Sequence, residues 1–236
     1  MTTQPTIILV HGAFADSSSW NGVIPRLREA GYPVVAAANP LRGLDSDAAY
    51  VASVLDGIEG PIVLAGHSYG GSVITVAAHG KPDVRALVYI AAFIPAEGES
   101  ALELTDKFPG STLAPTTTPA SYPLSGGGTG TELSIRQTEF PAQFAADVPA
   151  DLAATMAVTQ RPVSLDALQQ SATAAAWRTI ASYSLITTED KNIPLESQRF
   201  MSTRAAAHTI EVPASHAVSV SNPTAVTDLI LLAAQK

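Results

Sequence analysis

Short apolar runs recur along this chain, and segments with helical periodicity separate most of them. The runs are rich in Val, Ile, Leu and Ala, which is typical of strands buried on both faces of a parallel sheet. The predicted strands are Thr6–Val10, Val34–Ala38, Ile62–Ala65, Val84–Ala91, Tyr183–Thr187 and Thr209–Val212.

The intervening segments carry apolar residues on one helical face. Asn222 and Pro223 are typical of a helix N-cap and first helical position. Strands alternating with helices predict an α/β fold with a mostly parallel sheet of about six strands flanked by helices. The apolar faces comprise Trp20, Val23, Ile24 and Leu27, then Ala48, Val51, Leu55 and Ile58, then Val226, Leu229, Ile230 and Ala233.

This rhythm breaks between about Pro95 and Ala176, where prolines accumulate and the run Gly126-Gly127-Gly128 occurs. The stretch is too long for an ordinary loop. It predicts a cap over residues 95–176, inserted into a core formed by residues 1–94 and 177–236. The glycine run lacks the Gly-Lys-Ser/Thr of a phosphate loop and predicts a flexible turn.

Composition narrows the class of protein. The chain has 236 residues, of which 46% are hydrophobic and 14% charged, so one folded domain is expected. The formal net charge of −8 argues against nucleic-acid binding. The chain has no cysteine, which excludes disulfides, thiolate metal sites and a cysteine nucleophile.

The N-terminal residues lack the basic start and long apolar run of a secretory signal. No stretch approaches the ~20 apolar residues of a membrane span. A soluble, cytoplasmic protein with no membrane partner is therefore expected, although a processed export signal could have preceded this chain. The oligomeric state stays open, with a homodimer as one option.

The segment Gly66-His67-Ser68-Tyr69-Gly70 matches the pattern G-x-S-x-G. A predicted strand precedes it and a helical segment follows, which is the context of a nucleophile elbow. The sharp turn lifts the serine oxygen above the sheet, and its two glycines let neighbouring backbone approach closely. The pattern predicts Ser68 as a nucleophile; the alternative is a glycine-rich turn with a helix-capping serine.

A serine nucleophile needs a general base, and the chain has five histidines. His216 lies just beyond the last predicted strand, at the carboxyl edge of the sheet, where it can reach Ser68. It is the predicted base, and the alternative is a packing or surface histidine. The other four are unsuitable because they lie next to the serine, in a loop, along the following helix or at the opposite edge: His67, His11, His79 and His208.

The base in turn needs a carboxylate to fix its tautomer. Asp190 follows a predicted strand at its carboxyl end and precedes His216, giving the chain order Ser, Asp, His. Glu97 and Glu99, which follow an earlier strand, are the alternatives.

The loop His11-Gly12-Ala13-Phe14 follows the first predicted strand directly. A loop there supplies one backbone N–H to an oxyanion, and the residue after the nucleophile supplies the other. Ala13 and Tyr69 are the predicted donors, with Phe14 as a near alternative. Phe14, Tyr69 and Trp20 are also expected to line an apolar substrate pocket.

These segments together resemble the α/β-hydrolase superfamily over the whole chain. The opening Ile8–Phe14, Trp20, the serine motif and the tail segments Thr188–Lys191 and Ser215–Ala217 are similar to those of small bacterial carboxylesterases, plant methylesterases and hydroxynitrile lyases. The resemblance implies a triad of Ser68, Asp190 and His216. The lyases carry threonine in place of Gly12 and lysine in place of Ala217, so cyanohydrin cleavage is disfavoured.

The expected function is therefore hydrolysis of a small-molecule carboxylic ester through an acyl-enzyme, with no cofactor and no metal. The alternatives are a lactone, thioester, peracid or acyl-transfer reaction on the same triad, or a non-catalytic ligand-binding homologue that keeps the pocket.

Overall fold

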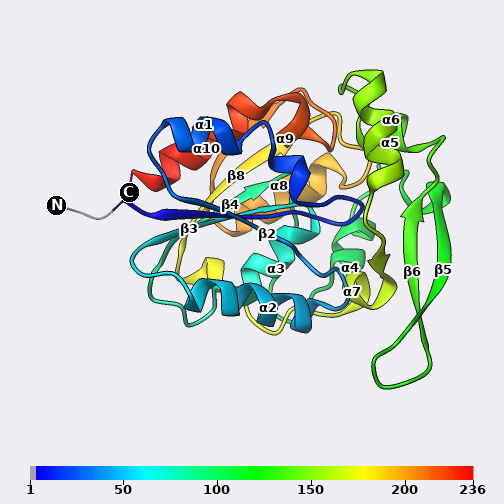
Figure 1. Cartoon of the computed structure of the whole chain (residues 1–236), viewed down its shortest axis with the longest axis horizontal. Coiled ribbons are helices and arrows are strands. Elements are labelled where there is room, and N and C mark those ends of the chain that lie inside the picture. Colours follow the sequence, from blue (N-terminus) through cyan, green and yellow to red (C-terminus); the bar gives the residue numbers. More distant parts are fainter. Residues whose placement is uncertain (1–3, 236) are drawn as a thin grey trace.

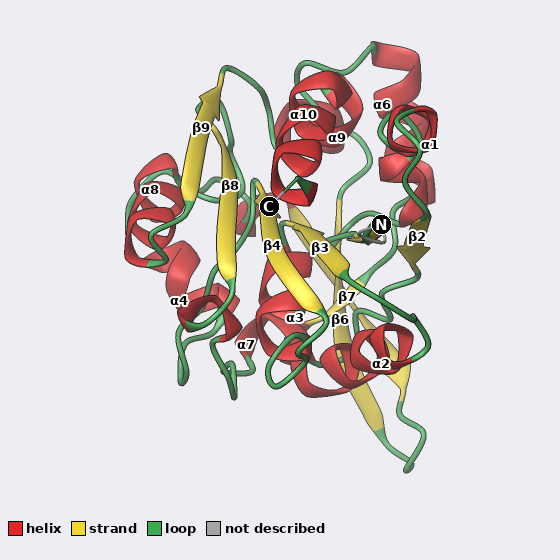
Figure 2. Ribbon diagram, turned by 90° about the vertical axis from the view of Figure 1, so that its left-hand side faces the viewer, coloured by secondary structure: helices red, strands yellow, loops and turns green. Residues whose placement is uncertain are grey.

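Six parallel strands form the central sheet in the order β2-β1-β3-β4-β8-β9 (Figures 1 and 2). The structure is a computed structural model, and it describes residues 4–235. The predicted parallel sheet is confirmed, and each strand lies within two residues of its predicted bounds. The strands are β1 (Thr6–Val10), β2 (Val34–Ala37), β3 (Ile62–His67), β4 (Val84–Ile90), β8 (Ala181–Thr187) and β9 (His208–Val212).

Helices cover both faces of this sheet because successive strand side chains point to opposite sides. In β1, Ile8 and Val10 pack into one core cluster, whereas Ile7 and Leu9 pack into the other. Figure 1 shows α1 (Ile24–Glu29) and α10 (Pro223–Ala234) on one face, and α2 (Leu44–Asp56) and α3 (Tyr69–Ala77) on the opposite face. Helix α8 (Leu195–Arg204) contributes Met201 to the core cluster that contains Ile8.

Two helical segments differ in detail from their sequence patterns. The apolar face from Trp20 to Leu27 is divided between a 3₁₀ turn, η1 (Ser17–Trp20), and the short helix α1, which has Pro25 at its start. Proline lacks the N–H that would continue a preceding helix, so it begins a new one. At the other end of the chain, the Asn222 side chain accepts from the Ala225 N–H, as expected of an N-cap, and a single turn, α9 (Val218–Ser221), precedes it.

Residues 95–176 form short helices and a small antiparallel sheet, and most of their buried apolar residues join the core cluster that contains Ile8. Figure 1 shows the hairpin of β5 and β6 standing at one end of the molecule. This three-stranded sheet is not indicated by the sequence pattern. Strand β5 contains two prolines and is an edge strand, where missing N–H donors are tolerated. The elements are α4 (Ala101–Asp106), η2 (Ala114–Thr116), β5 (Thr117–Pro123), β6 (Thr129–Ile135), α5 (Phe140–Phe144), α6 (Ala150–Thr159), β7 (Val163–Ser164), α7 (Leu165–Gln169) and η3 (Ala176–Arg178).

The glycine run 126–128 forms the turn between β5 and β6, where the Leu124 N–H donates to Gly128 O. Among the described helices, none has the length and apolar character needed to cross a bilayer. All six strands of the main sheet end at the same edge, so the loops after β1, β3, β8 and β9 gather there.

Gly70 carries a packing constraint at this edge. A Cβ at Gly70 would lie 2.5 Å from Val10 O and 2.9 Å from His11 O, both backbone atoms. Gly70→Ala is therefore expected to lower the free energy of unfolding by about 1–3 kcal/mol, measured by urea denaturation.

The matched control is Gly126→Ala, because a Cβ there meets no atom within 4 Å. That change should stay within about 0.5 kcal/mol of wild type. Equal stabilities of the two variants would contradict the close approach of the β1 loop to α3.

Candidate active site

Ser68 occupies the turn between β3 and α3. Its backbone has φ 53° and ψ −123°, a left-handed conformation that is strained for a residue with a side chain. The turn is held by β4 and the segment after it, since the Ser68 N–H donates to Ile90 O at 3.2 Å and Ser68 O accepts from the Phe93 N–H at 3.2 Å. The strand, sharp turn and helix expected of a nucleophile elbow are therefore all present.

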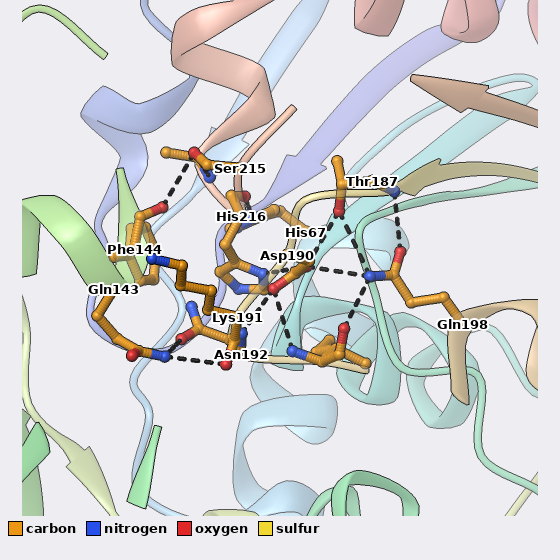
Figure 3. A network of polar contacts seen from close by, with 12 residues as sticks. His67, Gln143, Phe144, Thr187, Asp190, Lys191, Asn192, Gln198, Ser215 and His216 are labelled. Carbon is orange, nitrogen blue, oxygen red and sulfur yellow. Dashed lines mark hydrogen bonds and ion pairs between the residues drawn. The ribbon is translucent and has the colours of Figure 1, made fainter. Parts of the chain in front are cut away.

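His216 lies in the loop after β9 and contacts Asp190, which lies in the loop after β8. The Nδ1 of His216 is 2.7 Å from Oδ2 of Asp190, and both side chains are buried (Figure 3). A carboxylate only accepts, so Nδ1 carries a proton, and in the neutral form of the ring Nε2 has the lone pair. His216 is thus in the tautomer that a general base requires.

Asp190 is at the centre of a polar network in which its two oxygens accept five hydrogen bonds (Figure 3). Burial raises the pKa of this carboxyl, but the charge and hydrogen bond of His216, followed by the N–H groups of Asn192 and Ile193, lower it, and the net pKa is below its usual value. The carboxyl group is therefore ionised at neutral pH. Thr187 Oγ1 and Gln198 Nε2 also donate to Oδ2, at 3.0 and 3.1 Å.

The side chain of His67, the residue before Ser68, holds the main chain of His216. Its Nε2 donates to His216 O at 2.8 Å, and the two imidazole ring centroids lie 4.7 Å apart. Burial, and then the charge of His216, lower the pKa of His67 to about 3. His67 is therefore a neutral donor throughout the physiological range, rather than a second base.

The inserted segment also holds the loop that carries His216. Phe144 O accepts from the Ala217 N–H at 3.0 Å, and the Asp147 carboxylate accepts from the Ser215 N–H at 3.1 Å and from the Ser215 hydroxyl. Substitutions at the end of α5 are therefore expected to disturb the loop that carries His216.

The loop after β1 lies directly against the turn that carries Ser68. A Cβ at Gly12 would be 2.6 Å from the Ser68 Cβ and 2.7 Å from His67 O, so only glycine fits without rearrangement. Phe14, two residues on, has a positive φ of 58°. Within the described part of the chain, neither the Ala13 N–H nor the Tyr69 N–H donates to another residue. Both are therefore unpaired within residues 4–235.

A cavity of about 280 Å³ joins these groups, since Ala13, Phe14, Ser68, Tyr69 and His216 all line it. The inserted segment supplies most of the apolar wall, and this wall includes Leu102, Leu113, Ala114, Leu133, Leu165 and Leu168.

The prediction that Trp20 lines the substrate pocket is wrong, because Trp20 is not among the residues that line the cavity. Its side chain is fully buried in the core cluster of Val23 and Leu27, with its ring 6.4 Å from that of His67. The helical face that groups Trp20 with these apolar residues points to the core rather than to the cavity.

Glu97 and Glu99, the alternatives to Asp190, do not contact His216. Glu99 accepts from the Arg204 guanidinium at 2.7 Å, and Glu97 is exposed in the loop leading to α4. The structure therefore brings Asp190, and neither glutamate, to His216.

Several supporting polar residues are not indicated by the sequence. Gln198 and Gln143 have no motif around them. Asp47 carries a usable signal, because it lies on the apolar face of α2 with Leu44, Ala48 and Val51. Its buried carboxylate accepts from the Tyr69 hydroxyl at 2.9 Å, behind the predicted oxyanion donor.

Within residues 4–235, no group of three or more His, Asp or Glu side chains has the arrangement of a metal site.

Comparisons with known proteins identify the family of this chain. Residues 7–229 match the family model described as the Alpha/beta hydrolase family. The chain is 34% identical over 113 residues to a carbendazim hydrolyzing esterase of Nocardioides sp., a match covering 42% of this chain and 47% of that relative. The matched part is thus less than half of that relative's length.

Two solved structures share the fold over nearly the whole chain. Polyneuridine aldehyde esterase has a TM-score of 0.83 at 20% identity, covering 97% of this chain and 98% of that one. A pyrethroid hydrolase from Sphingobium faniae has a TM-score of 0.78 at 23% identity, covering 99% and 98%.

The six-stranded parallel sheet with a small insertion is the α/β-hydrolase fold. The chain belongs to the α/β hydrolase family, which confirms the resemblance found in its sequence. Its distant relatives are esterases and other hydrolases.

The lowered pKa of Asp190 has a consequence for stability. A carboxyl whose pKa is lower in the folded state than its unfolded value of about 3.9 stabilises the fold above that value, and this contribution disappears as the pH falls through the folded pKa. The difference in free energy of unfolding between wild type and Asp190→Asn should therefore shrink as the pH falls from about 5 to about 3, measured by urea denaturation. A difference that stays constant over this range would contradict the charged network.

Proposed function

We propose that this protein is a serine hydrolase that cleaves carboxylic esters through an acyl-enzyme. The observation that carries the proposal is the buried His216–Asp190 pair, in which His216 lines the same cavity as Ser68 at its strained turn. The esterase relative supports an ester as the class of substrate.

In the first half-reaction, Ser68 Oγ attacks the ester carbonyl carbon while His216 Nε2 takes the hydroxyl proton. The Ala13 and Tyr69 N–H groups donate to the oxyanion that forms, and the start of α3 adds the positive end of its dipole. Collapse of the tetrahedral intermediate breaks the bond to the leaving alcohol, which receives the proton from His216.

In the second half-reaction, a water molecule attacks the acyl group, and His216 now takes the water proton. Collapse returns that proton to Ser68 and releases the acid. Asp190 stays ionised throughout and stabilises the imidazolium that forms in each half. The largely apolar cavity favours an uncharged organic group next to the ester.

Ser68→Ala should abolish covalent labelling by a fluorophosphonate probe and lower turnover of p-nitrophenyl butyrate by at least about 10³-fold, because the nucleophile is lost. Intact-protein mass spectrometry measures the label, and thermal unfolding shows that the variant folds. Wild-type protein that takes up no phosphonate, or a variant that keeps turnover within tenfold of wild type after removal of contaminating esterases, would refute the proposal.

Asp190→Asn should lower kcat by roughly 10³–10⁴-fold, because the amide no longer fixes the tautomer of His216 or stabilises its charge. Glu97→Gln is the matched control, since it removes an exposed carboxylate at the start of the insertion and should leave kcat within about twofold. Similar losses of kcat in both variants would show that Asp190 is wrongly assigned as the third member of the triad.

A further inference from the structure

Asn192 presents a buried polar group that the ester mechanism does not use. It lies in the loop after β8, its residue is 3% exposed, and it lines the cavity that contains Ser68. Its side-chain nitrogen, Nδ2, is buried and has no hydrogen-bond partner among the described residues. Leaving a buried donor unsatisfied is costly, so such a group at a cavity wall is a candidate for ligand recognition.

Neighbouring hydrogen bonds fix the orientation of the Asn192 amide. A carbonyl oxygen only accepts, so the Gln143 atom that contacts Lys191 O is the amide donor Nε2, and Gln143 Oε1 accepts from the Thr112 hydroxyl at 2.8 Å. Gln143 Nε2 donates to Asn192 Oδ1 at 2.8 Å and to Lys191 O at 2.9 Å (Figure 3). Because Oδ1 is engaged with Gln143, Nδ2 of Asn192 is the group that stays free.

The backbone of Asn192 is also fixed relative to the catalytic groups. Its N–H donates to Asp190 Oδ1 at 2.7 Å, and Asp190 holds His216. The free amide nitrogen therefore has a defined position with respect to the triad, which is what a specificity determinant requires.

The charge of the cavity restricts the kind of acceptor. Among the described residues that line it there is no lysine or arginine, and the only carboxylate is that of Asp106. Lys107, next in the chain, places its ammonium group 4.8 Å from the centroid of the Phe200 ring, which does not line this cavity. An anionic acceptor would have no cation to pair with, so an uncharged oxygen fits this site.

We propose that Asn192 selects esters that carry a second, uncharged oxygen acceptor, donating from Nδ2 to a ketone, ether or further carbonyl oxygen on the group that fills the cavity. The proposal rests on the proposed ester hydrolysis and adds a class of substrate to it. A neutral hydrogen bond of this kind contributes about 0.5–1.5 kcal/mol, which corresponds to a preference of roughly two- to twelvefold.

The test compares p-nitrophenyl hexanoate with its 4-oxo and 5-oxo analogues, after subtraction of uncatalysed hydrolysis. The measured quantity is the ratio of kcat/KM for an oxo ester to kcat/KM for hexanoate. Comparing this ratio between variants removes both the intrinsic reactivity of each ester and any general loss of catalysis. For the better-placed ketone, the wild-type ratio should exceed that of Asn192→Leu by roughly two- to twelvefold.

Asn192→Asp provides a second variant, because it keeps an oxygen to accept from Gln143 but lacks the donor. Its ratio should fall as in Asn192→Leu, and it replaces that variant if the leucine protein is inactive on hexanoate. The matched control is Asn21→Leu, at a residue that does not line this cavity, which should keep the wild-type ratio. A third ester, the p-nitrophenyl monoester of adipic acid, carries a carboxylate and should react more slowly than hexanoate.

The selectivity proposal is overturned if neither oxo ester has a higher ratio in wild type than in both Asn192 variants, or if the adipate monoester is preferred. These outcomes leave the ester mechanism untouched, because hexanoate hydrolysis and phosphonate labelling of Ser68 report on it separately. Absence of both of those activities would refute the mechanism instead.

Discussion

The buried carboxylate of Asp190 is the constraint on which the rest of the site depends. A charge held away from water is costly unless it is paired and hydrogen-bonded. Here His216, two backbone N–H groups, a hydroxyl and an amide satisfy it together. The positions of Thr187, Gln198 and Asn192 follow from this requirement, since each has to direct a donor at the same two oxygens.

His216 is fixed at both its side chain and its main chain. Asp190 holds the imidazole, whereas the neutral His67 holds the backbone carbonyl from the turn that carries Ser68. The turn that carries Ser68 and the loop that carries His216 are thus joined by a hydrogen bond that does not involve the His216 side chain. A histidine suits this position because burial keeps it uncharged while its Nε2–H remains a donor.

The main sheet and the shared edge that carries Ser68, Asp190 and His216 could be predicted because both follow from local patterns. Buried parallel strands give continuous apolar runs, and Ser68, Asp190 and His216 each stand directly after such a run, at the carboxyl edge that all the strands share. The order of the groups along the chain then identifies Asp190 among the candidate acids, and the structure places it beside the imidazole.

The inserted sheet, the supporting glutamines and the lining of the cavity depend on tertiary contacts that local sequence patterns do not indicate. Strand β5 contains two prolines and is exposed along most of its length, so it lacks the apolar alternation of a predictable strand. Gln143 and Gln198 are ordinary helix residues whose buried amides acquire a role only when distant loops meet them. Trp20 shares its apolar periodicity with core residues, and that periodicity does not distinguish a core from a pocket.

The inserted segment contacts both halves of the candidate site. Through Phe144 and Asp147 it holds the loop that carries His216. Through β6 it is connected to the Tyr69 side chain. Arg42 makes this second connection, since its guanidinium contacts Glu132 at 2.6 Å and its backbone N–H donates to Asp47, which in turn binds the Tyr69 hydroxyl. Because Tyr69 also carries a predicted oxyanion N–H, the segment that lines the cavity is tied to the groups that would stabilise the reaction. Changes in this segment should therefore be judged by their effects on kcat as well as on substrate preference.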